Sequence, residues 1–216
     1  EVSAVASPIG KIAVDADFGP HLEAFRRALD VREALDAPYI RIFSFFIPAG
    51  DDPAKHRTAV LNRMERLVRL AEERGAVLGH ENERHIYGEK PAQCHDLLTT
   101  IDSPSFRAIW DPANFVQAGV TRPHDAGYAL VRPYLAYVQI KDAVAATGAV
   151  VPAGEGDGQI RETLATLNAD GFDGFFSLEP HLAVAGASGG FSGPALFKRA
   201  ADAFTALLRE QGIPWD

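Results

Sequence analysis

Residues 39–80 read YIRIFSFFIPAGDDPAKHRTAVLNRMERLVRLAEERGAVLGH, and this segment sets the architecture of the chain. Tyr39–Phe46 is rich in β-branched and aromatic residues, which is typical of a strand. Asp52 followed by proline predicts the start of a helix, and Gly75 predicts its end. Apolar residues at helical spacing lie between these signals: Val60, Met64, Leu67 and Ala71. Ala76–His80 then predicts a second strand, parallel to the first, because parallel neighbours need a crossover connection.

The same alternation of strand and helix extends over the rest of the chain. The further strand candidates are Val2–Ala6, Phe106–Trp110, Tyr134–Ile140 and Gly174–Leu178. Apolar residues at helical spacing predict an early helix at Leu22, Phe25 and Leu29, and a last helix, opened by Gly193-Pro194, with Phe197, Ala201, Phe204 and Leu208 on one face. Strands at intervals of roughly 30 to 40 residues match the size of βα repeats. We therefore predict a parallel α/β sheet in a single domain over residues 1–216.

Composition excludes several classes of function. The chain has 216 residues and a formal net charge of −8, and nucleic-acid binding rests on Lys and Arg that neutralise phosphates, so we expect no nucleic-acid partner. No stretch approaches the ~20 apolar residues of a membrane helix, so we expect no membrane partner. Cys94 is the one cysteine, which excludes a disulfide within the chain and fits a reducing cytoplasm. The spacing around Cys94 predicts a residue of a helical core rather than a nucleophile.

Polar side chains stand at the ends of four successive strand candidates. They are Glu81, Asp111, Gln139 and Glu179. The carboxyl ends of parallel barrel strands face one side, so these side chains are expected to converge. Three carboxylates in one pocket repel each other, and a divalent cation removes that cost; oxygen ligands suit Mg²⁺ or Mn²⁺. The alternative for each acid taken alone is a helix N-cap or a surface charge.

Short motifs in a fixed order give the chain a resemblance to a known family. The motifs are Ser7-Pro8-Ile9-Gly10-Lys11, His80-Glu81-Asn82, Trp110-Asp111-Pro112-Ala113-Asn114, Val138-Gln139-Ile140-Lys141-Asp142, Gly154-Glu155-Gly156 and Leu178-Glu179-Pro180-His181. From about Ser7 to the last helix, the sequence resembles the xylose isomerase-like TIM-barrel superfamily of sugar phosphate isomerases and epimerases. The resemblance implies a (β/α)8 TIM barrel that lacks its first two βα units, roughly 50 to 60 residues of a ~250-residue barrel, in residues 1–216. The first and last strands are then expected not to pair with each other.

The resemblance also implies a metal site. Its ligands would be Glu81, Asp111, position 139 and Glu179, and this chain departs from the family at Gln139, where the family carries histidine. An amide oxygen is a weaker donor than imidazole to Zn²⁺ or Co²⁺, which leaves Mn²⁺ or Mg²⁺ as the expected cofactor. Further residues are candidates for substrate contacts: Asn114, Lys141, His181 and Glu155. Each has an alternative: an Asx turn for Asn114, a salt bridge to Asp142 for Lys141, a cap or surface position for His181, and a plain turn for Glu155.

The implied activity is isomerisation or epimerisation of a keto sugar or sugar phosphate. In such family members the metal holds two adjacent oxygens of the substrate and stabilises an enediolate, while two carboxylates, here Glu81 and Glu179, move the proton. The expected partner is a small-molecule sugar, and a homo-oligomer is an open alternative. Other functions also stay open: a dehydratase acting on a keto-inositol or related cyclic polyol, and a metal-depleted, non-catalytic homologue. The apurinic endonuclease branch is disfavoured. That branch uses a His-rich zinc cluster, whereas the strand ends of this acidic chain carry few histidines.

Overall fold

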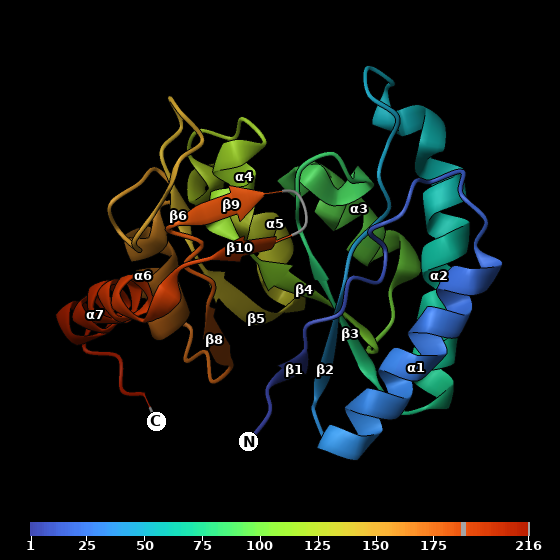
Figure 1. Ribbon diagram of the computed structural model, residues 1–216, viewed down its shortest axis with the longest axis horizontal. Helices are drawn as coiled ribbons and strands as arrows, with labels where there is room; N and C mark the ends of the chain where they lie inside the picture. The colour runs from blue at the N-terminus through green and yellow to red at the C-terminus, as the bar shows by residue number, and fades with distance from the viewer. Residues whose placement is uncertain (187–188, 216) are drawn as a thin grey trace.

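The computed structural model describes residues 1–186 and 189–215, and its centre is a parallel sheet (Figure 1). The strands of this sheet are β1 (Ala4–Val5), β2 (Tyr39–Ile42), β3 (Val77–Glu81), β4 (Phe106–Trp110), β5 (Leu135–Ile140) and β8 (Phe175–Leu178). They lie in the order β1-β2-β3-β4-β5-β8, and every neighbouring pair is parallel. This confirms that six strands lie where they were predicted and that they are parallel, although β1 is shorter than the predicted Val2–Ala6 and β2 is shorter than the predicted Tyr39–Phe46. β1 and β8 are the two edges and do not pair with each other, as expected for an arc of a TIM barrel rather than a closed one.

Helices connect the strands and cover the outside of the sheet. The α-helices are α1 (Gly19–Leu35), α2 (Arg57–Glu73), α3 (Pro91–Ile101), α4 (Pro112–Gln117), α5 (Ala129–Val131), α6 (Ile160–Ala169) and α7 (Gly193–Gln211). Shorter turns of 3-10 or π helix are η1 (Pro53–His56), η2 (Tyr87–Glu89), η3 (His124–Tyr128) and η4 (Arg132–Tyr134). Two small antiparallel pairs complete the fold, β6 (Asp142–Ala143) with β7 (Val150–Val151), and β9 (Val184–Gly186) with β10 (Gly189–Phe191). Within the described ranges, none of the helices has the length and apolar character needed to cross a membrane.

The arc is curved enough to bring distant strands into contact across its hollow side. Tyr39 of β2 stacks on Tyr137 of β5 with ring centroids 6.4 Å apart, although two strands separate them in the sheet. The ring of Phe175 from β8 meets Tyr39 edge-on at 6.3 Å. Residues on alternate strand positions point inward in a barrel. The side chains two and four residues further along these strands therefore point into the same interior, nearer its carboxyl end.

Strand β2 ends earlier than the sequence predicts, at Ile42 instead of Phe46. The backbone beyond Ile42 pairs with an earlier loop: Phe43 N donates to Ile9 O at 2.7 Å, and Phe45 N donates to Gly10 O at 3.0 Å. This contact requires glycine at position 10, because φ is +93° there and a Cβ would lie 1.9 Å from Phe43 O. A contact between segments more than 30 residues apart thus overrides the local strand preference of the aromatic run.

The helix boundaries follow the predicted signals, with one correction on α7. Asp52 caps η1, since its side chain accepts from Ala54 N at 3.0 Å, and α2 continues from there. The predicted apolar face of α7 is wrong at Phe197, which is 51% exposed. The helix instead buries a face that is shifted by about one position: Ala200, Phe204, Leu207 and Leu208. Phe197 borders a cavity beside the end of β8, together with Leu178, Glu179 and His181.

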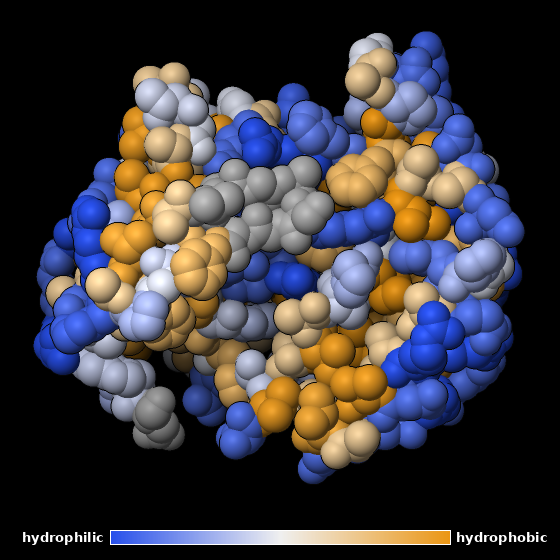
Figure 2. Space-filling model, in the orientation of Figure 1, coloured by the Kyte–Doolittle hydropathy of each residue, from blue (hydrophilic) through white to orange (hydrophobic). Residues whose placement is uncertain are grey.

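Apolar residues also reach the surface at the amino-terminal end of the sheet. Figure 2 shows them at the lower centre of this face, where Figure 1 places β1 and the carboxyl end of α1. The exposed apolar residues of these segments are Val2, Val31 and Leu35. Because all strands of the sheet run the same way, this surface lies at the opposite end from the carboxyl rim. Glu81, Asp111 and Glu179, considered next, lie at or directly after the ends of strands at that rim.

Candidate active site

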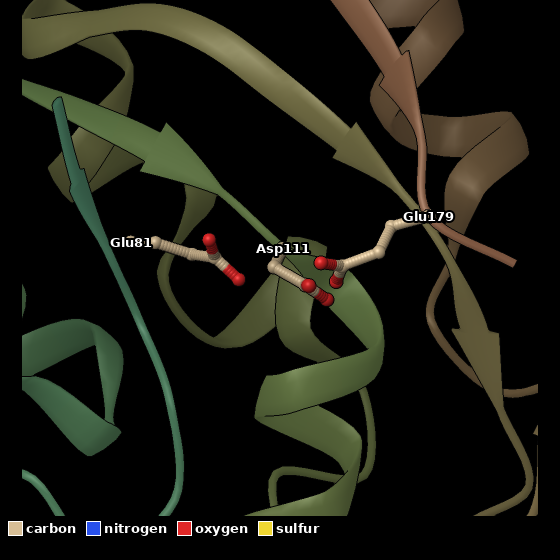
Figure 3. Close-up of side chains that lie close together, drawn as sticks. All are labelled: Glu81, Asp111 and Glu179. Atoms are coloured by element: carbon tan, nitrogen blue, oxygen red, sulfur yellow. The ribbon is translucent and has the colours of Figure 1, made fainter. Parts of the chain in front are cut away.

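Glu81, Asp111 and Glu179 meet at the carboxyl rim of the sheet, as the sequence predicts, and we call them the carboxylate cluster. Glu81 is the last residue of β3, Asp111 follows β4, and Glu179 follows β8. One oxygen from each lies within 4.8 Å of the others. Figure 3 shows Glu81 and Glu179 reaching toward each other from opposite sides, with Asp111 between them. Glu81 and Asp111 are buried, whereas the side chain of Glu179 is 22% exposed, so the cluster opens to solvent beside Glu179.

Two cationic side chains lie against the carboxylate cluster. Lys141 Nζ is 2.6 Å from Glu179 Oε2 and 2.9 Å from Asp111 Oδ2. Arg41 Nη1, from β2, is 3.2 Å from Glu81 Oε2 and 3.4 Å from Glu179 Oε1. The alternative pairing of Lys141 with Asp142 is therefore wrong, because neighbours in an extended segment point to opposite sides. Sequence reasoning missed Arg41, although a charged residue in an otherwise apolar strand was the available signal.

Asn114 connects the carboxylate cluster to the helix behind it. Its Nδ2 donates to Glu81 Oε1 at 3.1 Å and to Asn82 O at 2.9 Å. Asp111 Oδ1 accepts from Asn114 N at 2.9 Å and so caps α4, while its other oxygen faces Lys141. Asp111 is thus both a helix cap, through Oδ1, and a member of the carboxylate cluster, through Oδ2. The predicted contact of Asn114 with a substrate stays a prediction.

Gln139 points into the same interior but is engaged by a neighbour on β8. Its Oε1 accepts from Ser177 Oγ at 2.9 Å. Both residues line a cavity of about 230 Å³ together with Arg41 and Glu179. In the structure, the Gln139 oxygen is thus engaged by Ser177, and within the described residues Gln139 makes no hydrogen bond to the carboxylate cluster. Its role as a fourth ligand therefore stays a prediction.

The remaining candidates divide between the rim and the outer surface. His181 Nε2 lies 3.7 Å from Glu179 Oε1, beside the carboxylate cluster. Glu155 instead pairs with Arg199 of α7 through a contact of 2.7 Å, with both side chains about half exposed. Two other residues lie on the outer side of the sheet. His80 Nε2 lies 2.9 Å from Ser44 Oγ, and Cys94 is buried in α3, as expected for a residue of a helical core. Burial lowers the pKa of His80 to about 3, so this imidazole is neutral.

The surroundings give the three carboxyl groups of the cluster different pKa values. Burial, reinforced by Glu179 and Asp111, raises the pKa of Glu81 to about 8 despite the nearby Arg41. Burial also raises the pKa of Asp111, to about 6. For Glu179, burial alone would raise the pKa, but the charge and hydrogen bond of Lys141 outweigh it and lower the pKa. The carboxylates of Asp111 and Glu179 in turn outweigh the effect of burial on Lys141 and raise its pKa. At neutral pH the cluster thus holds one neutral acid and one firmly ionised base, the pairing that acid–base chemistry requires.

The oxygens of the carboxylate cluster fit a hard divalent cation. Among the residues that the structure describes, Glu81 Oε2 and Asp111 Oδ2 are buried without a hydrogen-bond partner, although each lies within ion-pair distance of a cation. Carboxylate oxygens are the ligands that Mg²⁺ and Mn²⁺ prefer. The donor set is thus suitable for such an ion, with Glu81, Asp111 and Glu179 as the residues that would hold it.

Asp142 holds the loop beside the site through its backbone. Its two oxygens accept from the N–H groups of Gly154, Gly156 and Gly158 at 2.9–3.0 Å and of Ala143 at 2.9 Å. Glycine is needed for this approach, since a Cβ on Gly156 would lie 2.6 Å from Asp142 Oδ1. The backbone N–H groups of the Gly-rich motif thus bind the carboxylate of Asp142, a residue of the same chain.

We expect Asp142→Ala to lower the free energy of unfolding by about 2 kcal/mol, measured by urea denaturation. Each buried N–H group left without a partner costs about 1–3 kcal/mol. The N–H groups of the more exposed loop glycines can donate to water instead, which reduces the total loss. Asp157→Ala is the control, because Asp157 accepts a single backbone hydrogen bond, from Ala145 N, at an exposed position. Equal losses in the two variants would contradict the role given to Asp142.

Nearly the whole length of the chain matches a known family. Residues 3–212 match the family described as xylose isomerase-like TIM barrel. The chain belongs to this family. Over 143 residues it is 34% identical to the 2-epi-5-epi-valiolone 7-phosphate 2-epimerase of an Actinoplanes species. The aligned segment covers 65% of this chain and 50% of that protein. The chain thus spans about half the length of this curated relative.

Solved structures of other proteins share the fold of this chain at low sequence identity. The probable 3-DHS dehydratase AsbF of Bacillus anthracis is 18% identical with a TM-score of 0.76, over 95% of this chain and 76% of that one. A D-tagatose 3-epimerase-like protein is 18% identical with a TM-score of 0.77, over 98% of this chain and 79% of that one. These likenesses support the six-strand sheet as an arc of the family's barrel.

Proposed function

We propose that this chain acts as an isomerase or epimerase of a keto sugar or sugar phosphate, with a divalent cation as cofactor. The observation that carries the proposal is the carboxylate cluster, in which three strands place carboxylate oxygens within 4.8 Å of one another at the carboxyl rim. The rim is where barrel enzymes of this architecture carry their chemistry. The similarity to an epimerase at 34% identity supports the same reaction class.

Glu81, Asp111 and Glu179 would hold Mn²⁺ or Mg²⁺, with Gln139 as a candidate for a fourth position. When bound, such a cation polarises the substrate carbonyl and makes the neighbouring C–H more acidic. The protein's own contribution is to bring three acids together in a buried place, where they bind a cation more strongly than at the surface. The cofactor in this proposal is Mn²⁺ or Mg²⁺ rather than Zn²⁺, because the donors are hard oxygens.

Glu179 and Glu81 are suited to opposite halves of a proton transfer. Lys141 lowers the pKa of Glu179 and keeps it ionised, so Glu179 is the group that accepts the substrate proton. Glu81 is the second glutamate of the carboxylate cluster, and we assign it the return of a proton to the substrate carbon. The two side chains approach the centre of the cluster from opposite sides (Figure 3), and a proton removed on one face and returned on the other inverts the carbon.

The polar residues around the carboxylate cluster would orient the substrate. Asn114 holds Glu81 and has an amide beside the site, and His181 borders Glu179 at the exposed side of the cluster. Arg41 supplies a fixed positive charge between Glu81 and Glu179. We assign these residues to binding sugar hydroxyls and to positioning the two glutamates.

The test is exchange of substrate hydrogen with solvent. We expect the protein with Mn²⁺ to incorporate deuterium from D₂O at the carbon next to the carbonyl of a keto sugar, keto-sugar phosphate or keto-polyol, followed by NMR. Chelation with EDTA is expected to stop the exchange, and Mn²⁺ to restore it. Product analysis separates epimerisation from dehydration, because only the second yields an enone absorbance. Absence of exchange across these substrates, with Mn²⁺ shown to be bound, would contradict the proposal.

A further inference from the structure

Lys141 contacts two of the three carboxylates that would hold the proposed metal. Its ammonium lies 2.6 Å from Glu179 Oε2 and 2.9 Å from Asp111 Oδ2, so it bridges two of the three carboxylates. Its side chain is only 5% exposed, which keeps the contact out of solvent. Charged contacts of this kind are weakly screened when buried. The ammonium thus neutralises the same oxygens that would bind a cation.

Arg41 balances carboxylate charge on the other side of the carboxylate cluster. Its guanidinium lies between Glu81 and Glu179, at 3.2 and 3.4 Å. The three carboxyl groups and the two cations nearly compensate each other: the net charge of the cluster is 0 when Glu81 carries its proton and −1 when it does not. Like charges so close together would otherwise repel each other. The protein therefore holds its three acids together with its own side chains, independently of a metal.

We propose that Lys141 competes with the divalent cation for Asp111 and Glu179 and thereby sets the metal affinity of the site. This inference rests on the proposed function, since it concerns the same carboxylates. A cation that binds Asp111 Oδ2 and Glu179 Oε2 must displace the ammonium from both, or accept its repulsion at close range. Arg41 differs, because it contacts Glu81 and Glu179 but not Asp111, so it leaves one side of the cluster free.

The experiment is titration calorimetry of the full chain with Mn²⁺. We expect Lys141→Met to bind Mn²⁺ about tenfold more tightly than the unchanged protein, because it removes a positive charge close to the ligand oxygens. Lys141→Arg keeps the charge and is expected to bind like the unchanged protein. Lys198→Met removes a lysine that is ion-paired with Asp202 on the surface of α7, and it controls for the change in overall charge.

Thermal unfolding gives a second readout that does not depend on activity. A ligand that binds only the folded state raises the melting temperature more as its affinity rises. Mn²⁺ is therefore expected to raise the melting temperature of Lys141→Met more than that of the unchanged protein. If the methionine variant does not fold, Lys141→Gln removes the same charge while keeping a group that donates to Asp111, and both measurements are made on it.

The outcomes separate this inference from the proposed function. Equal or weaker Mn²⁺ binding by the charge-removing variant, with measurable binding by the unchanged protein, would overturn the competition and leave the proposed function in place. Tighter binding by Lys141→Arg as well would also overturn it, because the charge is then not the cause. If neither the unchanged protein nor the charge-removing variant binds Mn²⁺ or Mg²⁺, the competition and the proposed cofactor both fail.

Discussion

Glu179→Gln is expected to lower the rate of deuterium uptake into a keto-sugar substrate by about 10²–10⁴-fold, the usual loss when one member of an acid–base pair is removed. Glutamine has the shape of glutamate but cannot accept the proton. Lys141 keeps Glu179 ionised in the structure, and the amide removes this charge without leaving a gap. The measurement is NMR of the substrate in D₂O, with Mn²⁺ at saturating concentration so that a weaker metal site does not imitate a lost base.

The control for Glu179→Gln is Glu33→Gln, which also replaces an ion-paired glutamate. Glu33 pairs with Arg74 on the surface, where its side chain is 46% exposed. We expect this variant to exchange deuterium at the rate of the unchanged protein. The far-UV circular dichroism of both variants should be unchanged. A rate of uptake in Glu179→Gln equal to that of the control would remove Glu179 from its proposed role.

Gln139→His is expected to raise the affinity for Zn²⁺ or Co²⁺ by about 10–100-fold, the range typical of changes near a metal ligand. Imidazole nitrogen is a stronger donor than an amide oxygen to these borderline metals, whereas Mg²⁺ and Mn²⁺ gain less. The ring would replace an amide oxygen that now accepts from Ser177. Titration calorimetry with each metal measures the change.

Gln211→His, at the end of α7, controls for an added imidazole away from the site. We expect its affinity for Zn²⁺ to match that of the unchanged protein. If the unchanged protein already binds Zn²⁺ as tightly as Gln139→His, Gln139 is not a ligand. The site would then have three protein ligands or a different fourth one.

The strands were predictable from the sequence where their composition alone determines them. Phe106–Trp110 matches β4 at both ends, and turn-forming residues flank it in the sequence. Tyr39–Phe46 was predicted too long, since Phe43 and Phe45 pair with a loop near Gly10. Local preference carries no information about such distant contacts. Phe197 was wrongly predicted to be buried for the same reason, because the neighbouring elements decide which face of a helix they cover.

The carboxylate cluster was predictable because each acid directly follows a strand, and parallel strands end on one rim. The cations around it were harder to find. Alternation along β5 places Gln139 and Lys141 on the same side and Asp142 on the other, which argues against a Lys141–Asp142 pair. The contact of Lys141 with Asp111 depends on the curvature of the sheet, and so does the reach of Arg41 to Glu179. Curvature is a property of the packed molecule, and the sequence pattern does not encode it locally.

Glu179 follows an edge strand, and this position ties the site to local unfolding. Within the residues that the structure describes, β8 pairs with β5 alone. The side-chain bonds from Ser177 to Gln139 and from Lys141 to Glu179 cross that same junction. Partial opening of an edge costs less free energy than global unfolding. Where β8 is such an edge, its fraying would carry Glu179 away from Glu81 and Asp111 while the rest of the sheet stays folded, so warming would disrupt the site before it melts the sheet.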